Sequence, residues 1–166
     1  MREDEILVKR RSRMVRTASK AIIIQDSKIL VIKKEDEIGP FYILPGGGQE
    51  HGENLYENLK RECMEEIGVE VEIDDLIFVR DYVGSNHGFE WDKGFHQLDL
   101  MFLCRIKEGQ PAPAAGVIPD DGQIGVEWLP VKNLTDYRLY PMSMLPSIMD
   151  LESGKKPEKI YLGDVN

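Results

Sequence analysis

Short apolar runs alternate with clusters of turn-forming residues along most of the chain. Residues 15–24 and 28–34 have the composition of β-strands, and Gln25, Asp26 and Ser27 between them predict a hairpin. Residues 21–24 are apolar without alternation, which indicates a strand buried on both faces. Further short strands are predicted at residues 41–44, 76–83, 97–106 and 126–129.

A different period marks residues 54–67. Apolar side chains recur there at three- and four-residue spacing, which predicts an α-helix whose apolar stripe faces the core: Tyr56, Leu59, Cys63 and Ile67. Gly68 stands where a left-handed C-terminal cap is expected. A second helix is predicted over residues 142–151. Strands mixed with helices, the longest helix in the middle, predict one α/β domain over residues 1–166, an α/β/α sandwich around a mixed sheet.

Three segments lack strand or helix periodicity and are predicted to be loops. Residues 45–48 read Pro-Gly-Gly-Gly, residues 84–95 are rich in Gly, Asn and His, and residues 110–122 contain three prolines. Loops between strands often carry binding specificity, so residues 84–95 are expected to contribute to the choice of substrate.

The composition is that of a soluble globular protein. The 166 residues suffice for one hydrophobic core, with 42% hydrophobic and 31% charged positions. No apolar run approaches the roughly 20 residues of a membrane-spanning helix, and the first residues contain no apolar stretch of signal-peptide length. We therefore expect a cytoplasmic protein without a membrane partner. Cys63 and Cys104 show no metal-binding spacing and are expected to be reduced, buried thiols.

Charge narrows the class of ligand. A net charge of −9 argues against binding to a nucleic acid polymer, which usually relies on a basic face. It leaves room for a phosphorylated small molecule, because divalent metal ions can stand between carboxylates and phosphate oxygens. One basic cluster is interpreted as a solvated patch, with phosphate contact or steering as the alternative: Lys9, Arg10, Arg11, Arg13 and Arg16.

Three glutamates on the predicted central helix are the main candidate for chemistry. Glu62, Glu65 and Glu66 recur at three- and four-residue spacing, so their carboxylates share one helix face. Such a face is more often simply solvated, but the flanking residues favour a cation site for Mg²⁺ or Mn²⁺. The glycines at 46–48 let the backbone approach a ligand closely. Glu53 suits the positive end of the helix dipole, and Arg61 lies within the acidic set.

The spacing of these residues resembles the Nudix box. Five residues separate Gly47 from Glu53, and seven separate Glu53 from Arg61. Every remaining fixed position of the box over residues 47–69 is also met: Glu62, Glu65, Glu66 and Gly68, with Cys63 and Val69 at its apolar positions. Cys63 is the mildest departure, since an aliphatic residue is more usual there. The preceding Leu44, Pro45 and Gly46 also resemble the family's approach to the box.

The resemblance implies a Nudix-type fold and a Mg²⁺-dependent hydrolase acting on a diphosphate. It implies metal ligation by Glu62, Glu65 and Glu66, with the Gly46 carbonyl as an additional ligand. Glu53 and Arg61 are expected to support the site and to orient its carboxylates. The general base stays open among four residues: Glu65, Glu90, Asp99 and Glu127.

The substrate is predicted only by class. Arg16, His87 and Trp91 are candidate substrate-binding residues, each with a structural role as the plainer alternative. Ser85, Asn86 and His87 stand where two substrate subfamilies carry a proline or a tyrosine, so neither signature is present. A nucleoside triphosphate or nucleotide sugar remains the expectation. The alternatives are a non-catalytic nucleotide- or sugar-sensing module and, less favoured, an isomerase of a small diphosphate. A homodimer is left open.

Overall fold

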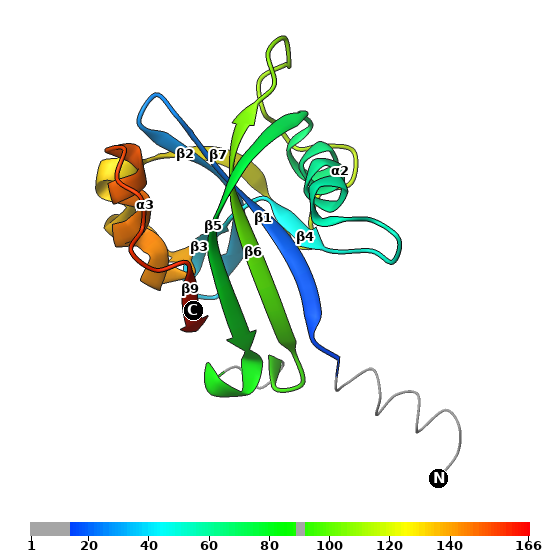
Figure 1. Cartoon of the computed structure of the whole chain (residues 1–166), viewed down its shortest axis with the longest axis vertical. Helices are drawn as coiled ribbons and strands as arrows, with labels where there is room; N and C mark the ends of the chain where they lie inside the picture. Colours follow the sequence, from blue (N-terminus) through cyan, green and yellow to red (C-terminus); the bar gives the residue numbers. More distant parts are fainter. Residues whose placement is uncertain (1–13, 89–91) are drawn as a thin grey trace.

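The computed structural model describes residues 14–88 and 92–166 (Figure 1). Glu90 and Trp91, which the sequence offered as a general base and a substrate contact, lie outside the described residues. So do four residues of the basic cluster: Lys9, Arg10, Arg11 and Arg13.

A curled, mixed β-sheet runs through the centre of the molecule (Figure 1). Within the described residues its strands follow the order β8-β3-β2-β1-β6-β5-β9, with β4 paired to β1 and β7 paired to β2. The pairs β1–β6, β3–β8 and β5–β9 are parallel, and the others are antiparallel. The strands are β1 (Arg16–Gln25), β2 (Lys28–Asp36), β3 (Gly39–Ile43), β4 (Gly46–Gly48), β5 (Val71–Val83), β6 (His96–Ile106), β7 (Gly125–Pro130), β8 (Leu139–Tyr140) and β9 (Tyr161–Asp164).

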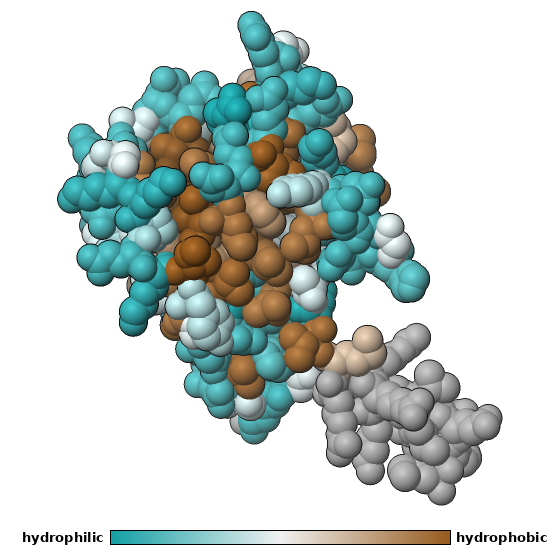
Figure 2. Space-filling view, in the orientation of Figure 1, coloured by the Kyte–Doolittle hydropathy of each residue, from teal (hydrophilic) through white to brown (hydrophobic). Residues whose placement is uncertain are grey.

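Helices cover the sheet on both sides, which confirms the predicted α/β class. Helix α2 (Leu55–Ile67) packs on one side. Helix α3 (Leu145–Glu152) and the 3-10 turns η3 (Val131–Asp136) and η4 (Met142–Met144) pack on the other. Each side has its own cluster of buried apolar side chains. Figure 2 shows further apolar side chains gathered over β1, β5 and β6, beside α2.

The hairpin and the central helix agree with the sequence pattern. Asp26 and Ser27 both take positive φ, 50° and 58°, as a tight turn matched to strand twist requires. Leu59, Cys63 and Ile67 are fully buried. Tyr56 was wrongly assigned to the same stripe: it is 55% exposed, and its ring rests against Phe102 with centroids 5.7 Å apart. A tyrosine can pack one face of its ring and leave the remainder in water.

Other boundaries differ from the prediction. Residues 46–48 form β4 rather than a loop, because glycines let this backbone lie against β1: a Cβ on Gly46 would stand 2.1 Å from the Ser19 carbonyl oxygen. Strand β5 begins at Val71, before the predicted start at Leu76, and the prediction was late because register shifts on either side of Leu76 interrupt the alternation of apolar and polar positions. Residues 142–144 are a 3-10 turn, so α3 begins only at Leu145. Strands β8 and β9 were not predicted.

Cys63, Cys104 and Trp128 all belong to the cluster of apolar side chains beneath α2. Cys63 and Cys104 are buried free thiols, as expected. No helix in the described ranges has the length and apolar character needed to cross a membrane.

Candidate functional site

Helix α2 begins and ends at residues whose local chemistry fixes its position. The Asn54 side chain accepts hydrogen bonds from the backbone N–H groups of Tyr56 and Glu57, each at 3.0 Å. The Glu57 carboxylate accepts in return from the Asn54 N–H at 2.8 Å, completing a capping box. Gly68 ends the helix with φ 68°, the left-handed cap that the sequence predicted.

Arg61 forms hydrogen bonds to three carboxylates of the site, those of Glu53, Glu62 and Glu65. Its Nη2 and Nε donate to the two oxygens of Glu53, at 2.8 and 3.1 Å. Its Nη1 donates to Glu62 at 2.9 Å and to Glu65 at 3.1 Å. Its Nη2 also reaches the Gly48 carbonyl at 3.2 Å. Hydrogen bonds from Arg61 hold the pKa of Glu53 down, at about 2. The structure thus brings together the three residues predicted as catalytic, Glu53, Arg61 and Glu65.

Glu66 has a different environment from its neighbours. Its side chain is almost fully buried and accepts a hydrogen bond from the Gly46 N–H at 2.8 Å. Burial raises the pKa of this carboxyl group to about 7, against the opposing charge of Lys20. The Gly46 carbonyl, a predicted metal ligand, accepts a hydrogen bond from Lys20 Nζ at 2.8 Å.

The donor set fits a hard divalent cation. Glu62, Glu65 and Glu66 supply carboxylate oxygens from neighbouring turns of one helix. A Cβ on Gly47 would stand 2.7 Å from the Glu62 carboxylate, so the glycine leaves that group its space. In the described part of the chain, no three acidic, His or Cys side chains converge closely enough to hold a metal ion by themselves. An open set suits Mg²⁺, which usually keeps waters and shares its remaining positions with substrate phosphates.

Asn58 is a site residue that the sequence reading missed. It is fully buried, and its Nδ2 donates to the Gly48 carbonyl at 2.9 Å and to Glu53 at 3.0 Å. The Ser19 hydroxyl donates to its Oδ1. Asn58 therefore ties the glycine strand to the helix. Its position next to the apolar stripe of the helix was the sequence signal that could have indicated a buried polar residue.

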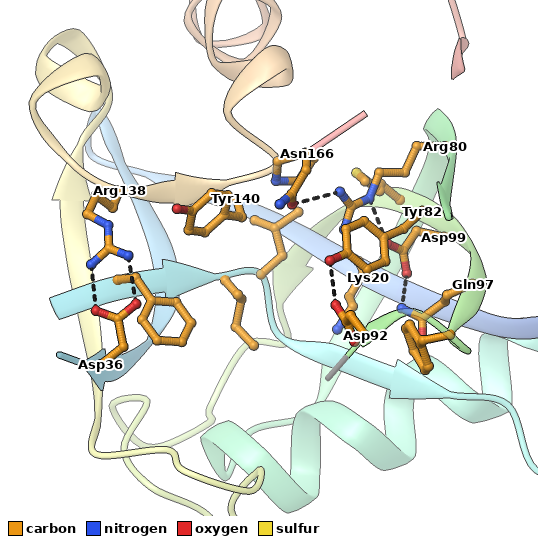
Figure 3. A pocket seen from close by; sticks show the side chains of 16 residues that line it. Lys20, Asp36, Arg80, Tyr82, Asp92, Gln97, Asp99, Arg138, Tyr140 and Asn166 are labelled. Atoms are coloured by element: carbon orange, nitrogen blue, oxygen red, sulfur yellow. Dashed lines mark hydrogen bonds and ion pairs between the residues drawn. The ribbon is translucent and has the colours of Figure 1, made fainter. Parts of the chain in front are cut away.

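A cavity of about 440 Å³ lies on the face of the sheet away from α2, and none of its lining residues belongs to α2 or β4 (Figure 3). Apolar and aromatic side chains make much of its wall: Phe41, Ile43, Leu44, Phe95, Met101 and Tyr140. Two pairs of polar side chains also line it. Arg138 donates to both oxygens of Asp36, at 3.0 and 2.7 Å, and the Tyr82 hydroxyl donates to Asp92.

The buried carboxylate of Asp99 closes one end of this cavity. Its two oxygens accept from Arg80 Nε at 2.8 Å and from Gln97 Nε2 at 2.7 Å. Arg80 also donates to the Val165 carbonyl at 2.7 Å, which brings Asn166 to the cavity wall. Asp99, a candidate general base, therefore has both oxygens occupied.

The other candidates lie apart from this cavity. Arg16 donates to Gln97 at 2.8 Å and lines a second cavity of about 600 Å³, together with Glu53. His87 stacks on Tyr82 with ring centroids 4.9 Å apart. Its Nε2 lies 2.7 Å from Asp164, outside the residues that line either cavity. Glu127 pairs with Lys33 at 2.8 Å and lines neither cavity.

Fold and site together define an α/β protein with an acidic helix suited to a divalent cation and a ligand-sized cavity, which Gly46 connects through its hydrogen bonds to Glu66 and Lys20. Comparison with known proteins places this class in a family. The sequence model of the NUDIX domain matches residues 14–147. The chain therefore belongs to the Nudix family of hydrolases.

Individual relatives are distant. The mouse protein "Nucleoside diphosphate-linked moiety X motif 6" is 26% identical over 111 residues, covering 67% of this chain and 33% of that protein. The chain thus spans about a third of the length of this relative. A NUDIX hydrolase from Nitrosomonas europaea has a TM-score of 0.66 at 19% identity, covering 86% of this chain and 92% of that one. A UDP-X diphosphatase has a TM-score of 0.63 at 18% identity, with 99% and 76% covered. At these identities the solved structures show the shared fold alone.

Proposed function

We propose that this chain is a Mg²⁺-dependent hydrolase that cleaves the pyrophosphate bond of a nucleoside diphosphate linked to another group. The observation that supports it most is the position of the acidic helix. Glu66 binds the Gly46 N–H, and the Gly46 carbonyl binds Lys20, which lines the 440 Å³ cavity. A diphosphate near Gly46 would therefore meet the carboxylates while the attached group enters the cavity.

The cation would be held by Glu62, Glu65 and Glu66. When bound, Mg²⁺ supplies charge neutralisation at the phosphoryl oxygens and activation of water. The contribution of the chain is then to hold these groups in place, which is the main requirement in phosphoryl transfer. Arg61 fixes Glu62 and Glu65 relative to Glu53, with donor–acceptor distances of 2.8–3.1 Å.

Glu65 is our choice of general base among the candidates. Arg61 binds its Oε2 at 3.1 Å, and its Oε1 has no hydrogen-bond partner among residues 14–88 and 92–166. Asp99 has both oxygens engaged and Glu127 is paired with Lys33. Oε1 of Glu65 is thus the oxygen free to take the proton of an attacking water.

The cavity suits a nucleoside or sugar in size and lining. Its volume lies within the usual range of small-molecule sites, roughly 300–1,000 Å³. Phe41 and Tyr140, with ring centroids 6.2 Å apart, offer aromatic faces for a base or sugar ring. The name of the mouse relative, a nucleoside diphosphate-linked moiety X protein, points to the same substrate class.

A phosphate-release screen with Mg²⁺ tests the proposal over nucleoside triphosphates, oxidised nucleotides, nucleotide sugars and dinucleotides. We expect at least one class to be hydrolysed, and Glu65→Gln to lower kcat by about 10²–10⁴-fold because a base is lost. Glu108→Gln, an exposed glutamate after β6, is the matched control and should hydrolyse at the wild-type rate.

Two outcomes would contradict the proposal. Unchanged turnover in both Glu65→Gln and Glu66→Gln would exclude the acidic helix as the catalytic site. Tight nucleotide binding without metal-dependent phosphate release would instead identify the sensing module considered from the sequence.

A further inference from the structure

Among the described residues, three cationic side chains line the 440 Å³ cavity, and two of them are already ion-paired (Figure 3). Arg80 is bound to Asp99 at 2.8 Å, and Arg138 is bound to Asp36 at 2.7 Å. Lys20 is the third. Within residues 14–88 and 92–166 no carboxylate lies within ion-pair distance of its ammonium group, and its hydrogen bond goes to the neutral Gly46 carbonyl.

The unpaired charge has donors to spare. A lysine ammonium carries three N–H donors. In the described part of the chain Lys20 uses one of them, at 2.8 Å to Gly46. The side chain is half-buried and reaches the cavity wall, so its remaining donors are available to a ligand there.

Arg61 cannot serve the same purpose. All three of its nitrogens donate within the site, to Glu53, Glu62, Glu65 and the Gly48 carbonyl. A phosphate oxygen could recruit Arg61 only by breaking bonds that orient the carboxylates. Lys20 could bind a phosphate oxygen without breaking any hydrogen bond to a carboxylate.

The position of Lys20 is set by strand pairing. Lys20 stands opposite Gly46 in the β1–β4 register, and the N–H of the same glycine binds Glu66. The ammonium group therefore lies at the boundary between the acidic helix and the cavity. A diphosphate that spans this boundary needs a positive charge on the cavity side, because the carboxylates concentrate negative charge on the other.

We propose that Lys20 is a substrate-binding residue that donates to an oxygen of the phosphate nearest the cavity-bound group. This inference rests on the proposed function, since it assumes that a diphosphate occupies the boundary. The contact is a charge-assisted hydrogen bond from a point charge, without the bidentate geometry of an arginine. It anchors the part of the substrate that the box residues do not reach.

Binding of imidodiphosphate, whose P–N–P bridge resists hydrolysis, tests the proposal by calorimetry with Mg²⁺ present. We expect Lys20→Met to weaken this binding by about tenfold or more, the loss of one charge-assisted bond, whereas Lys20→Arg retains most of it. Mn²⁺ affinity, followed by electron paramagnetic resonance, should be unchanged or higher in Lys20→Met. Lys107→Met removes the same charge from an exposed lysine paired with Glu70 and should bind like the wild type.

A second measurement on the wild-type chain does not depend on how the variants fold. Imidodiphosphate should protect Lys20, and not Lys107, from acylation as read by mass spectrometry. Wild-type affinity in Lys20→Met, no protection of Lys20, or no binding of imidodiphosphate would each overturn the proposal. If nucleotides are hydrolysed but imidodiphosphate does not protect Lys20, only the proposed role of Lys20 is contradicted. If Lys20 is protected but no nucleotide is hydrolysed, only the proposed enzymatic function is contradicted.

Discussion

Glu53 and Arg61 are joined by two hydrogen bonds, from Nη2 to Oε1 at 2.8 Å and from Nε to Oε2 at 3.1 Å. Glu53 precedes α2, and Arg61 lies in the middle of that helix. The pair therefore locks the loop before the helix onto the helix itself. The same guanidinium also donates to Glu62 and Glu65, so one side chain positions both the loop and the acidic face of the helix.

Replacing the Arg61 guanidinium by a lysine ammonium tests whether the hydrogen-bond geometry of Arg61, and not only its charge, supports the site. Arg61→Lys keeps the charge but loses the planar fork, so we expect a loss of about 1–3 kcal/mol in the free energy of unfolding. Turnover should fall by about 10–100-fold through misplaced carboxylates, as for other partners that orient metal ligands. Urea titration and steady-state kinetics measure the two effects. Stability and kcat both at wild-type values would show that the fork orients nothing.

The pair also predicts how stability depends on acidity. Arg61 lowers the pKa of Glu53 to about 2, whereas an unfolded glutamate titrates near pH ~4.3. The stabilisation is complete above the unfolded pKa and is lost as the pH falls from about 5 towards 2. Glu53→Gln cannot titrate, so its free energy of unfolding should fall less steeply over this range. Parallel curves for the two proteins would contradict the assignment.

Glu66 should show the opposite dependence in the absence of metal. Burial raises the pKa of its carboxyl group to about 7, so its effect favours folding below the unfolded pKa and is lost as the pH rises through 7. In EDTA at pH 8, Glu66→Gln should therefore be more stable than the wild type by roughly 1–3 kcal/mol. The gain should shrink at pH 5. If Glu66→Gln is more stable than the wild type but inactive, Glu66 serves function at a cost in stability. A less stable Glu66→Gln at pH 8 would contradict the raised pKa of Glu66.

Gly47 offers a test of the site that spares the core. A Cβ there would lie 2.7 Å from the Glu62 carboxylate, a flexible group that can move away. Gly47→Ala should thus change the free energy of unfolding by less than about 1 kcal/mol while weakening Mn²⁺ binding about tenfold. Gly125→Ala is the control, since its Cβ would meet Lys33 at an ordinary 3.8 Å. Equal Mn²⁺ affinities in both variants would show that Glu62 does not hold the cation.

The parts of the site that depend on nearby residues could be predicted from the sequence. The Asn54 and Gly68 caps follow from the chemistry of residues within one helical turn. The grouping of Glu53 with Arg61 follows from helical spacing and the box resemblance. Lys20 could not be assigned in this way, because its meeting with Gly46 depends on how β4 registers against β1.

The cavity was beyond prediction for the same reason. Its wall includes Tyr140, from a two-residue strand too short to show any period, and Arg80, whose contact with Val165 follows the pairing of β5 with β9. Pairings between distant segments are selected by packing and leave little trace in local sequence. The charge of Lys20 directly before the apolar run at residues 21–24 was a signal that the sequence analysis did not use.

The irregular segment at residues 110–122 has a consequence for how the acidic helix is maintained. Its backbone N–H groups at Ala114, Gly116 and Ile118 donate to the carbonyls of Ile67, Glu66 and Glu65, the last turn of α2. A Cβ on Gly116 would stand 2.2 Å from the Glu65 carbonyl oxygen, so the two backbones are in close contact. We therefore expect the end of the helix and this later segment to open as one cooperative unit, so their amide protons should show a common free energy of opening in hydrogen exchange.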